Sequence, residues 1–189
     1  MTLVAVATFA SACRSRHAAT SAADARADAA VPSVDSELAV FRSGMRARPS
    51  ALAGVPTQDS LIRLFERALA KRDTAVLDRL QLTREEFAYL YYPDSKMSRP
   101  PYELGPDVMW MQIKSQSDKG VRRLVAKYGG TRLRIAGLEC QPPDRQSAVV
   151  IHECGVRMKQ SPDSTVKQLF GSIIERDGRF KFVGYANRL

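Results

Sequence analysis

Large apolar residues in the middle of the chain recur at intervals of three and four, a spacing that gathers them on one face of an α-helix. Leu61, Phe65 and Leu69 follow this spacing with charged residues between them, so the sequence predicts a helix here, in a folded part that begins near Val55-Pro56-Thr57. Asp73 is a residue type favoured at helix N-caps, and it predicts a second, short helix directly after the first.

Two further helices are predicted from their start signals. Thr83 and Glu86 have the spacing of a capping box, in which each side chain accepts a hydrogen bond from the other residue's backbone N–H. Pro106 suits the first turn of a long helix, and Gly129 begins the pair of glycines that ends it. Gly120 lies inside this helix at a cost of about 1 kcal/mol relative to Ala, and it predicts a break there.

From Thr131 onward the apolar period changes from that of a helix to two residues, which is the period of a β-strand. Asp177-Gly178 between two apolar runs is a strong signal for a hairpin turn. Helices followed by strands predict an α+β domain, in which the N-terminal helices pack on a curved four-stranded antiparallel sheet. The four predicted strands are 131–138, 148–159, 166–176 and 179–187.

The last strands carry apolar residues on both alternating registers. A sheet that helices cover on one face needs only one apolar face, so the surplus predicts a homodimer that forms through the sheet. The alternative is a monomer, in which twist and a bulge near Gly171 or Gly184 blur the alternation. The apolar residues are Leu169, Ile173 and Val183 on one register and Phe170, Ile174, Phe180 and Phe182 on the other.

Part of this pattern is similar to a known superfamily. The first helix contains Leu64-Phe65-Glu66-Arg67-Ala68-Leu69-Ala70-Lys71-Arg72-Asp73, a short helix follows, and the closing hairpin reads Asp177-Gly178-Arg179-Phe180-Lys181-Phe182. Over about residues 56–189 these features resemble the nuclear-transport-factor-2-like superfamily, also called cystatin-like cones. The resemblance implies a cone-like sheet. It assigns no catalytic residue, because no acid or base position of the family's enzymes, such as the ketosteroid isomerases, falls on a matching motif. A clear short strand between the second and third helices is also missing.

The N-terminus indicates where the protein works. An apolar run from Leu3 to Ala12 is too short to span a bilayer and has the length of an export signal, which predicts a signal at residues 1–12. Cys13 follows Ala10-Ser11-Ala12 and resembles the lipidated Cys of a bacterial lipobox. We therefore expect an extracytoplasmic protein held at the membrane of the cell envelope by a lipid on Cys13. One alternative is ordinary signal cleavage at the same bond, which leaves Cys13 unmodified and the protein secreted or periplasmic. The other is a frayed, Ala-rich N-terminus with no role in export.

Residues 13–50 are predicted to be a disordered, Ala-rich linker, because they contain few large apolar residues to bury. A flexible coil of this length spans on the order of 30 Å. It would hold a single α+β domain, predicted at residues 51–189, clear of a lipid surface.

The positive charge of the chain limits the classes of partner that we expect it to bind. Lys and Arg outnumber Asp and Glu, which gives a formal net charge of +9 and a pI near 9.8. The cations are spread along the chain without a dense basic run or a nucleic-acid-binding motif, so we expect no nucleic acid partner. Anionic lipid headgroups or another anionic envelope component fit an exported basic protein. The alternative is an ordinary solvated surface.

Cys140 and Cys154 lie on consecutive predicted strands. In an oxidising compartment they are expected to form a disulfide, and the alternative is a pair of buried free thiols.

His152 is the candidate catalytic residue. It lies on the opposite strand face from Glu153, among apolar residues, and if that face lines a cone it can act as a general base. The alternative is a core histidine that one hydrogen bond satisfies. The other pocket candidates flank a Pro-rich loop and can line a pocket mouth or pack over the core. They are Tyr89, Tyr92, Tyr102 and Trp110.

These observations favour a lipid-anchored binding or envelope-interaction module without catalytic activity, cofactor or metal. The chain has no phosphate-binding loop and no nucleophile elbow, and it contains only two His residues. The alternative is a small-molecule lyase, isomerase or hydrolase that uses His152 in the cone cavity. A carboxylate beside His152 in an open cavity would favour the enzyme, and tight apolar packing would favour the module.

Overall fold

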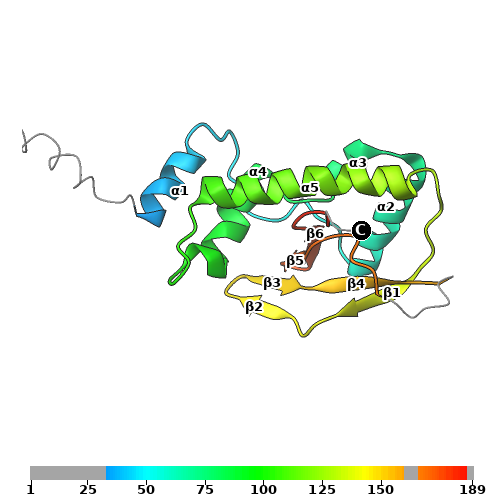
Figure 1. Ribbon diagram of the computed structural model, residues 1–189. Coiled ribbons are helices and arrows are strands. Elements are labelled where there is room, and N and C mark those ends of the chain that lie inside the picture. Colours follow the sequence, from blue (N-terminus) through cyan, green and yellow to red (C-terminus); the bar gives the residue numbers. More distant parts are fainter. Residues whose placement is uncertain (1–32, 160–165, 187–189) are drawn as a thin grey trace, which may run out of the picture. The chain divides into compact units, whose positions relative to one another are not determined.

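The computed structural model describes residues 33–159 and 166–186, so the predicted export signal at 1–12 and Cys13 lie outside the described residues. Figure 1 shows α5 along one side of the fold and strands β1 to β4 along the other. Among the described residues, no helix has both the length and the apolar character needed to cross a bilayer. The helices are α1 (Val34–Arg42), α2 (Gln58–Lys71), α3 (Thr74–Arg79), α4 (Arg84–Glu86), η2 (Phe87–Tyr91), η3 (Tyr92–Asp94), η4 (Lys96–Ser98) and α5 (Pro106–Tyr128).

The α+β class is confirmed, and the strands form two antiparallel sheets rather than one. The orders are β1–β4 in one sheet and β2–β3–β5–β6 in the other. Isolated bridges from Val156 to Lys167 and from Phe170 to Tyr185 continue the same order of neighbours beyond the strands. The strands are β1 (Ile135–Cys140), β2 (Asp144–Gln146), β3 (Val149–His152), β4 (Cys154–Met158), β5 (Ile173–Arg176) and β6 (Arg179–Phe182).

The long strand predicted at 148–159 is wrong as a single element, because it breaks at Glu153 into β3 and β4. Before the break His152 pairs with Ile173 of β5, and after it Cys154 pairs with Cys140 of β1. The break lets one segment pass from the four-stranded sheet to the two-stranded sheet. The alternation of apolar residues in the sequence continues across Glu153, so it does not indicate that the strand changes its partner there.

The predicted helix starts are confirmed by their caps. Asp73 Oδ1 accepts a hydrogen bond from the backbone N–H of Val76 at 2.9 Å. Thr83 Oγ1 accepts from the Glu86 N–H at 3.2 Å, and Glu86 Oε2 accepts from the Thr83 N–H at 2.9 Å. These caps satisfy backbone donors that the first turn of a helix leaves without partners.

The helix that begins at Thr83 changes geometry after α4, where it continues as the π-helical turn η2. Cationic side chains from distant elements supply donors to carbonyl groups of this turn. Arg42 of α1 donates to the Ala88 carbonyl at 2.7 and 3.1 Å, and Arg176 of β5 donates to the Leu90 carbonyl at 3.2 Å. The turn is therefore fixed between α1 and β5.

Helix α1 belongs to the folded domain, so the domain begins before residue 51, where the sequence predicted its start. The predicted linker at 13–50 includes α1, whereas the compact unit of the structure begins at Ser33. The side chain of Phe41 in α1 is buried, and the centre of its ring lies 5.7 Å from the centre of the Phe87 ring. The helix is stabilised by contacts with residues far along the chain, which its Ala-rich surroundings do not reveal.

The main core is centred on Phe65 of α2. Its ring centre lies 5.9 Å from Phe170, 5.6 Å from Phe182 and 5.9 Å from Tyr185. All four side chains are at most 3% exposed. The first long helix therefore packs on the last residues of the chain.

Both faces of the β5–β6 hairpin are covered within one chain. Ile173 and Phe182 pack with Phe65 on one face, and Ile174 packs with Leu82 and Leu90 on the other. The two apolar registers that predicted a homodimer are thus explained without a second copy. The surplus of apolar residues no longer supports that partner.

The outer edge of β6 is covered by segments from the first half of the domain. Val55 and Phe180 exchange backbone hydrogen bonds of 3.1 and 2.8 Å, and the Leu82 N–H donates to the Phe182 carbonyl at 2.9 Å. Gln81 forms an isolated parallel bridge with Phe182. This bridge lies between α3 and α4, where the sequence shows no clear short strand.

The break predicted at Gly120 is wrong, since α5 runs unbroken from Pro106 to Tyr128. Gly120 is buried, and a Cβ atom at this position would lie 2.6 Å from the Ala186 carbonyl oxygen and 2.8 Å from that of Tyr185. The glycine is needed because the C-terminal backbone passes directly against α5.

Candidate functional site

Helix α5 presents an outward face that is strongly cationic toward its C-terminal end. Lys119, Arg122, Arg123 and Lys127 are all exposed, and we call these four residues the cationic face. The opposite side of the helix buries Leu124 in the core. The exposed residues from 108 to 127 include no Asp or Glu; they are Val108, Met111, Gln112, Ser115, Gln116, Ala126 and the cationic face.

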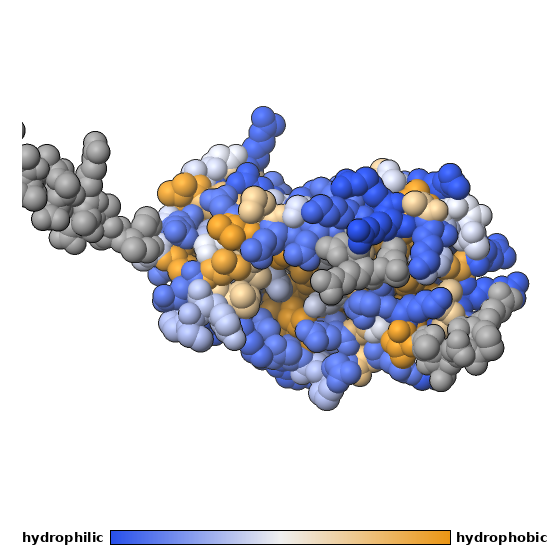
Figure 2. Space-filling view, viewed as in Figure 1, coloured by the Kyte–Doolittle hydropathy of each residue, from blue (hydrophilic) through white to orange (hydrophobic). Residues whose placement is uncertain are grey.

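The cationic face has no ion-pair partner among the described residues. Within residues 33–159 and 166–186, none of its four side chains lies within 4.0 Å of a carboxylate oxygen. Asp118, the carboxylate on the same half of α5, is paired with Lys114 at 2.8 Å. Figure 2 shows strongly hydrophilic side chains gathered over this part of the helix. Such a face attracts an extended anionic surface.

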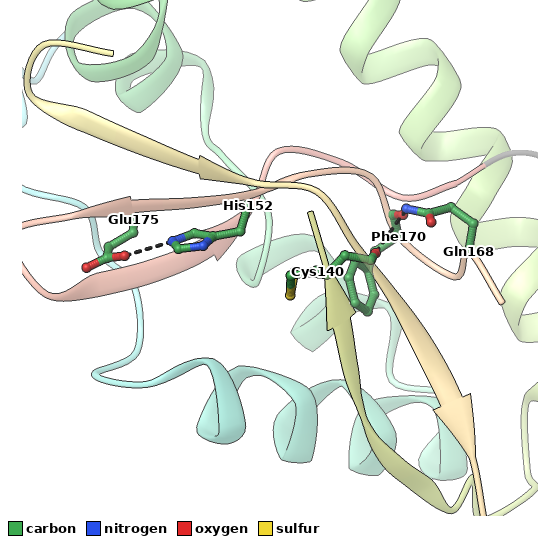
Figure 3. The surroundings of a disulfide bond; sticks show 6 residues. Cys140, His152, Gln168, Phe170 and Glu175 are labelled. Atoms are coloured by element: carbon green, nitrogen blue, oxygen red, sulfur yellow. Dashed lines mark hydrogen bonds and ion pairs between the residues drawn. A yellow bond between two sulfur atoms is a disulfide. The ribbon is translucent and has the colours of Figure 1, made fainter. Parts of the chain in front are cut away.

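His152 has a carboxylate partner that sequence reasoning missed. Its Nε2 atom lies 2.8 Å from Oε2 of Glu175, and the two side chains point toward each other from β3 and β5 (Figure 3). His152 pairs with Ile173 in the strand register, so Glu175 is its diagonal neighbour. Because 23 residues separate the pair, only the strand register brings it together.

The surroundings of His152 meet one of the two conditions for a catalytic site. A carboxylate beside an imidazole can orient the ring and stabilise its charged form. However, the hollow beside the disulfide does not include His152 in its lining, and the side chain of His152 is only 13% exposed. The contacts therefore describe a pair that joins two strands and lies outside the lining of this hollow.

The predicted disulfide between Cys140 and Cys154 is confirmed. The two residues are directly opposite each other at the end of the β1–β4 ladder. The Gln141 N–H donates to the Glu153 carbonyl just beyond them, at 2.9 Å, so the Cys pair is of the close, non-hydrogen-bonded type. The bond fixes the end of the two-stranded sheet at the point where the chain passes into β3.

A polar hollow of about 780 Å³ opens beside the disulfide. Gln168 fixes one wall, because its amide donates to the carbonyls of Cys154 at 3.1 Å and Phe170 at 2.6 Å. Glu139 in the lining is ion-paired with Arg157. In the described part of the chain, no three His, Cys, Asp or Glu side chains gather as a metal site. The lining residues are Glu139, Cys140, Gln141, Glu153, Cys154, Gly155, Val166, Gln168, Gly171 and Ser172.

The predicted aromatic pocket residues differ in their burial and contacts. Tyr92 is fully buried and donates its hydroxyl to the Leu104 carbonyl at 2.7 Å, while burial and the nearby Glu37 and Asp35 raise its pKa to about 12. Trp110 packs on Phe87 with ring centres 5.3 Å apart.

The other two tyrosines of that set are more accessible. The Arg42 guanidinium lies 4.5 Å from the ring centre of the partly buried Tyr89. Tyr102 is 62% exposed on the loop before α5. Packing thus accounts for Tyr92 and Trp110, and Tyr102 is left on the surface.

A buried ion pair is the other feature that the sequence did not reveal. Lys181 Nζ of β6 lies 2.7 Å from Oε2 of Glu86, and both side chains are 3% exposed. Glu86 also accepts from the N–H groups of Ala53 at 2.7 Å and Thr83 at 2.9 Å. This pair holds α4 and the preceding segment on the hairpin and is part of the core.

No family model, curated protein or solved structure with significant similarity to this chain is found.

Proposed function

We propose that this protein is an exported, lipid-anchored module that binds an anionic component of the cell envelope through its cationic face, without catalysing a reaction. The observation that carries the proposal is the run of exposed cations on α5, none of which has a carboxylate partner among the described residues. The Cys140–Cys154 disulfide supports work outside the cytoplasm, because such bonds persist in oxidising compartments. The apolar run before Cys13 supports the anchor.

We also infer that the domain is a divergent member of the nuclear-transport-factor-2-like superfamily. The closing hairpin, the strand order and the parallel bridge at Gln81 support this inference. In this proposal the fold holds α5 so that its cationic face is exposed to the partner.

Neutralising the cationic face should release the protein from anionic partners. In the full chain carrying Cys13→Ser, we expect Lys119→Gln, Arg122→Gln, Arg123→Gln and Lys127→Gln together to abolish co-sedimentation with a bacterial envelope fraction at low salt. Raising NaCl from about 0.05 to 0.5 M should release the unaltered chain, because salt screens exposed charges.

A matched control separates the face from net charge alone. Changing Arg132, Arg134, Arg145 and Arg179 to Gln removes the same number of exposed cations from other parts of the domain. This control should still sediment with the envelope. Equal release of both variants would show that total charge, and not the face of α5, is responsible.

The anchor gives a second expected result. In a bacterial host, the unaltered protein should fractionate with membranes that survive a high-salt wash, and Cys13→Ser should move to the soluble fraction. Mass spectrometry of the N-terminal peptide should find a diacylglycerol on Cys13. An unmodified Cys13 peptide, together with an unchanged distribution of the Cys13→Ser protein, would contradict the anchor.

A further inference from the structure

Apolar side chains are exposed at the end of the domain where α1 packs against the first turns of α5. Val40 is 69% exposed, Tyr102 and Met111 are each 62% exposed, and Val108 is 42% exposed. We call these four residues the end patch. Beneath them Phe41 and neighbouring side chains form a separate small core. Figure 2 shows hydrophobic side chains on the surface at this end.

Two residues of the end patch share one side of α5 with part of the cationic face. Val108 and Met111 are three residues apart and lie on the same exposed side of α5 as Ser115, Lys119 and Arg122. A helix rises 1.5 Å per residue, so Met111 and Lys119 are about 12 Å apart along the axis. One side of α5 is therefore apolar near its start and cationic toward its end.

The end patch also lies where the chain enters the domain. Helix α1 is the first element of the compact unit, and residues 14–33 separate it from Cys13. If these residues form the coil that the sequence predicts, their ends are on the order of 25 Å apart. A lipid on Cys13 would therefore keep this end of the domain, rather than the β1–β4 sheet, close to the bilayer.

We infer that the anionic partner is the membrane surface itself, on which the domain docks with the end patch in the interface and the cationic face over the headgroups. This inference rests on the proposed function and names its partner. Apolar residues beside cations match a lipid interface, where apolar side chains enter the boundary layer and Lys and Arg meet anionic headgroups. Tyr102 has the apolar body and polar tip that suit this boundary.

Glu103 and Asp107 are the exposed carboxylates next to Tyr102 and Val108 in the sequence, and Asp107 has a cation beside it. Asp107 precedes Val108 and is exposed, but its Oδ1 lies 3.9 Å from the Arg84 guanidinium. Arg84 in turn lies 4.4 Å above the ring of Phe41. The cation beside Asp107 offsets its charge at the edge of the end patch.

A bilayer is distinguished from an anionic polymer by the end patch. A polymer needs only the cationic face, whereas insertion into a lipid interface also uses the apolar side chains. Trp110 is the single tryptophan of the chain and lies between Met109 and Met111, so its fluorescence reports directly on this end of α5.

The experiment uses the full chain with Cys13→Ser and vesicles of phosphatidylcholine with a minority of phosphatidylglycerol. We expect brominated acyl chains to quench the emission of Trp110 on binding, because Trp110 lies directly beside Met111 in the chain. Val40→Ser, Val108→Ser and Met111→Ser together should weaken binding by at least about tenfold, because burial of these side chains contributes to partitioning. Each cation removed from the cationic face should weaken it by about fivefold.

Val166→Ser is the matched control, because Val166 is 43% exposed beside β4 and lies outside the end patch. It should bind as the unaltered chain does. Thermal unfolding should show that the end-patch variant is folded. Binding that depends on the cationic face but not on the end patch, with no quenching of Trp110, would overturn the docking inference and leave the proposed function in place. Binding to the envelope fraction that is unaffected by neutralising the cationic face would overturn both.

Discussion

Replacing Lys181 by Met should lower the free energy of unfolding by about 3–5 kcal/mol, because the change leaves the Glu86 carboxylate charged and buried without its cation. Lys181 Nζ lies 2.7 Å from that carboxylate, and both side chains are 3% exposed. The N–H groups of Ala53 and Thr83 still donate to Glu86, but two backbone dipoles do not replace an ammonium group. The loss should be measured by urea denaturation followed by circular dichroism.

Two further variants make this result specific. Arg179→Met changes an exposed cation on the same strand and should alter stability by less than about 0.5 kcal/mol. Adding Glu86→Gln to Lys181→Met should recover part of the loss, because the amide is neutral and can still accept a hydrogen bond from Ala53 or Thr83. A Lys181→Met protein as stable as the Arg179→Met protein would refute the proposed role of the pair.

Opening the Cys140–Cys154 disulfide should cost about 3 kcal/mol of stability, given the sequence separation of 14 residues. The bond constrains the unfolded chain, and in the folded chain it joins β1 to β4 in the two-stranded sheet. We expect a reductant to lower the midpoint of urea denaturation for the unaltered chain. Cys140→Ala with Cys154→Ala should match the reduced protein and be unaffected by the reductant.

The linkage itself can be read from a tryptic digest. Cleavage after Arg134, Arg145 and Arg157 places Cys140 and Cys154 on separate peptides, 135–145 and 146–157. Without reductant these peptides should be recovered as one linked species. Complete alkylation of both thiols before reduction would show that the bond is absent.

The sequence was sufficient for elements whose signals are local. The N-cap at Asp73 and the capping box of Thr83 and Glu86 depend on residues three positions apart, and the hairpin depends on the dipeptide Asp177-Gly178. In the structure Asp177 and Gly178 both have positive φ, of 50° and 67°, as a tight hairpin turn requires. Such features are decided before any distant contact forms.

Features that depend on distant partners were not predicted. Helix α1 was assigned to the linker because its stability comes from Phe41 packing on Phe87, and no pattern within the helix reports that contact. Glu86 and Lys181 are 95 residues apart, so their pairing follows only from the tertiary fold. Within the candidate site, the cationic face was not predicted, although its four cations have helical spacing, and the exposure of Val40 on α1 follows only from the tertiary fold.

Gly120 is a position where a local signal gave a wrong prediction because a distant contact decides the structure. Helix propensity assigns Gly120 a cost and predicts a break, yet the helix is continuous because the backbone at Tyr185 and Ala186 occupies the space of a side chain. Gly120 weakens its own helix, but it is required because a segment distant in the sequence packs against it.

The late position of the core aromatics has a consequence for the order of folding. Phe65 packs on Phe170, Phe182 and Tyr185, and the Tyr185 hydroxyl donates to the Leu77 carbonyl, 108 residues earlier in the chain. Contacts this far apart must close a long loop before they stabilise anything, which slows folding. During synthesis the helices emerge first, and Phe65 has no partners for the main core until the final hairpin follows. The main core should therefore stay open until residues 170–185 are made, which is the state that the proposed export through a narrow translocation channel would need.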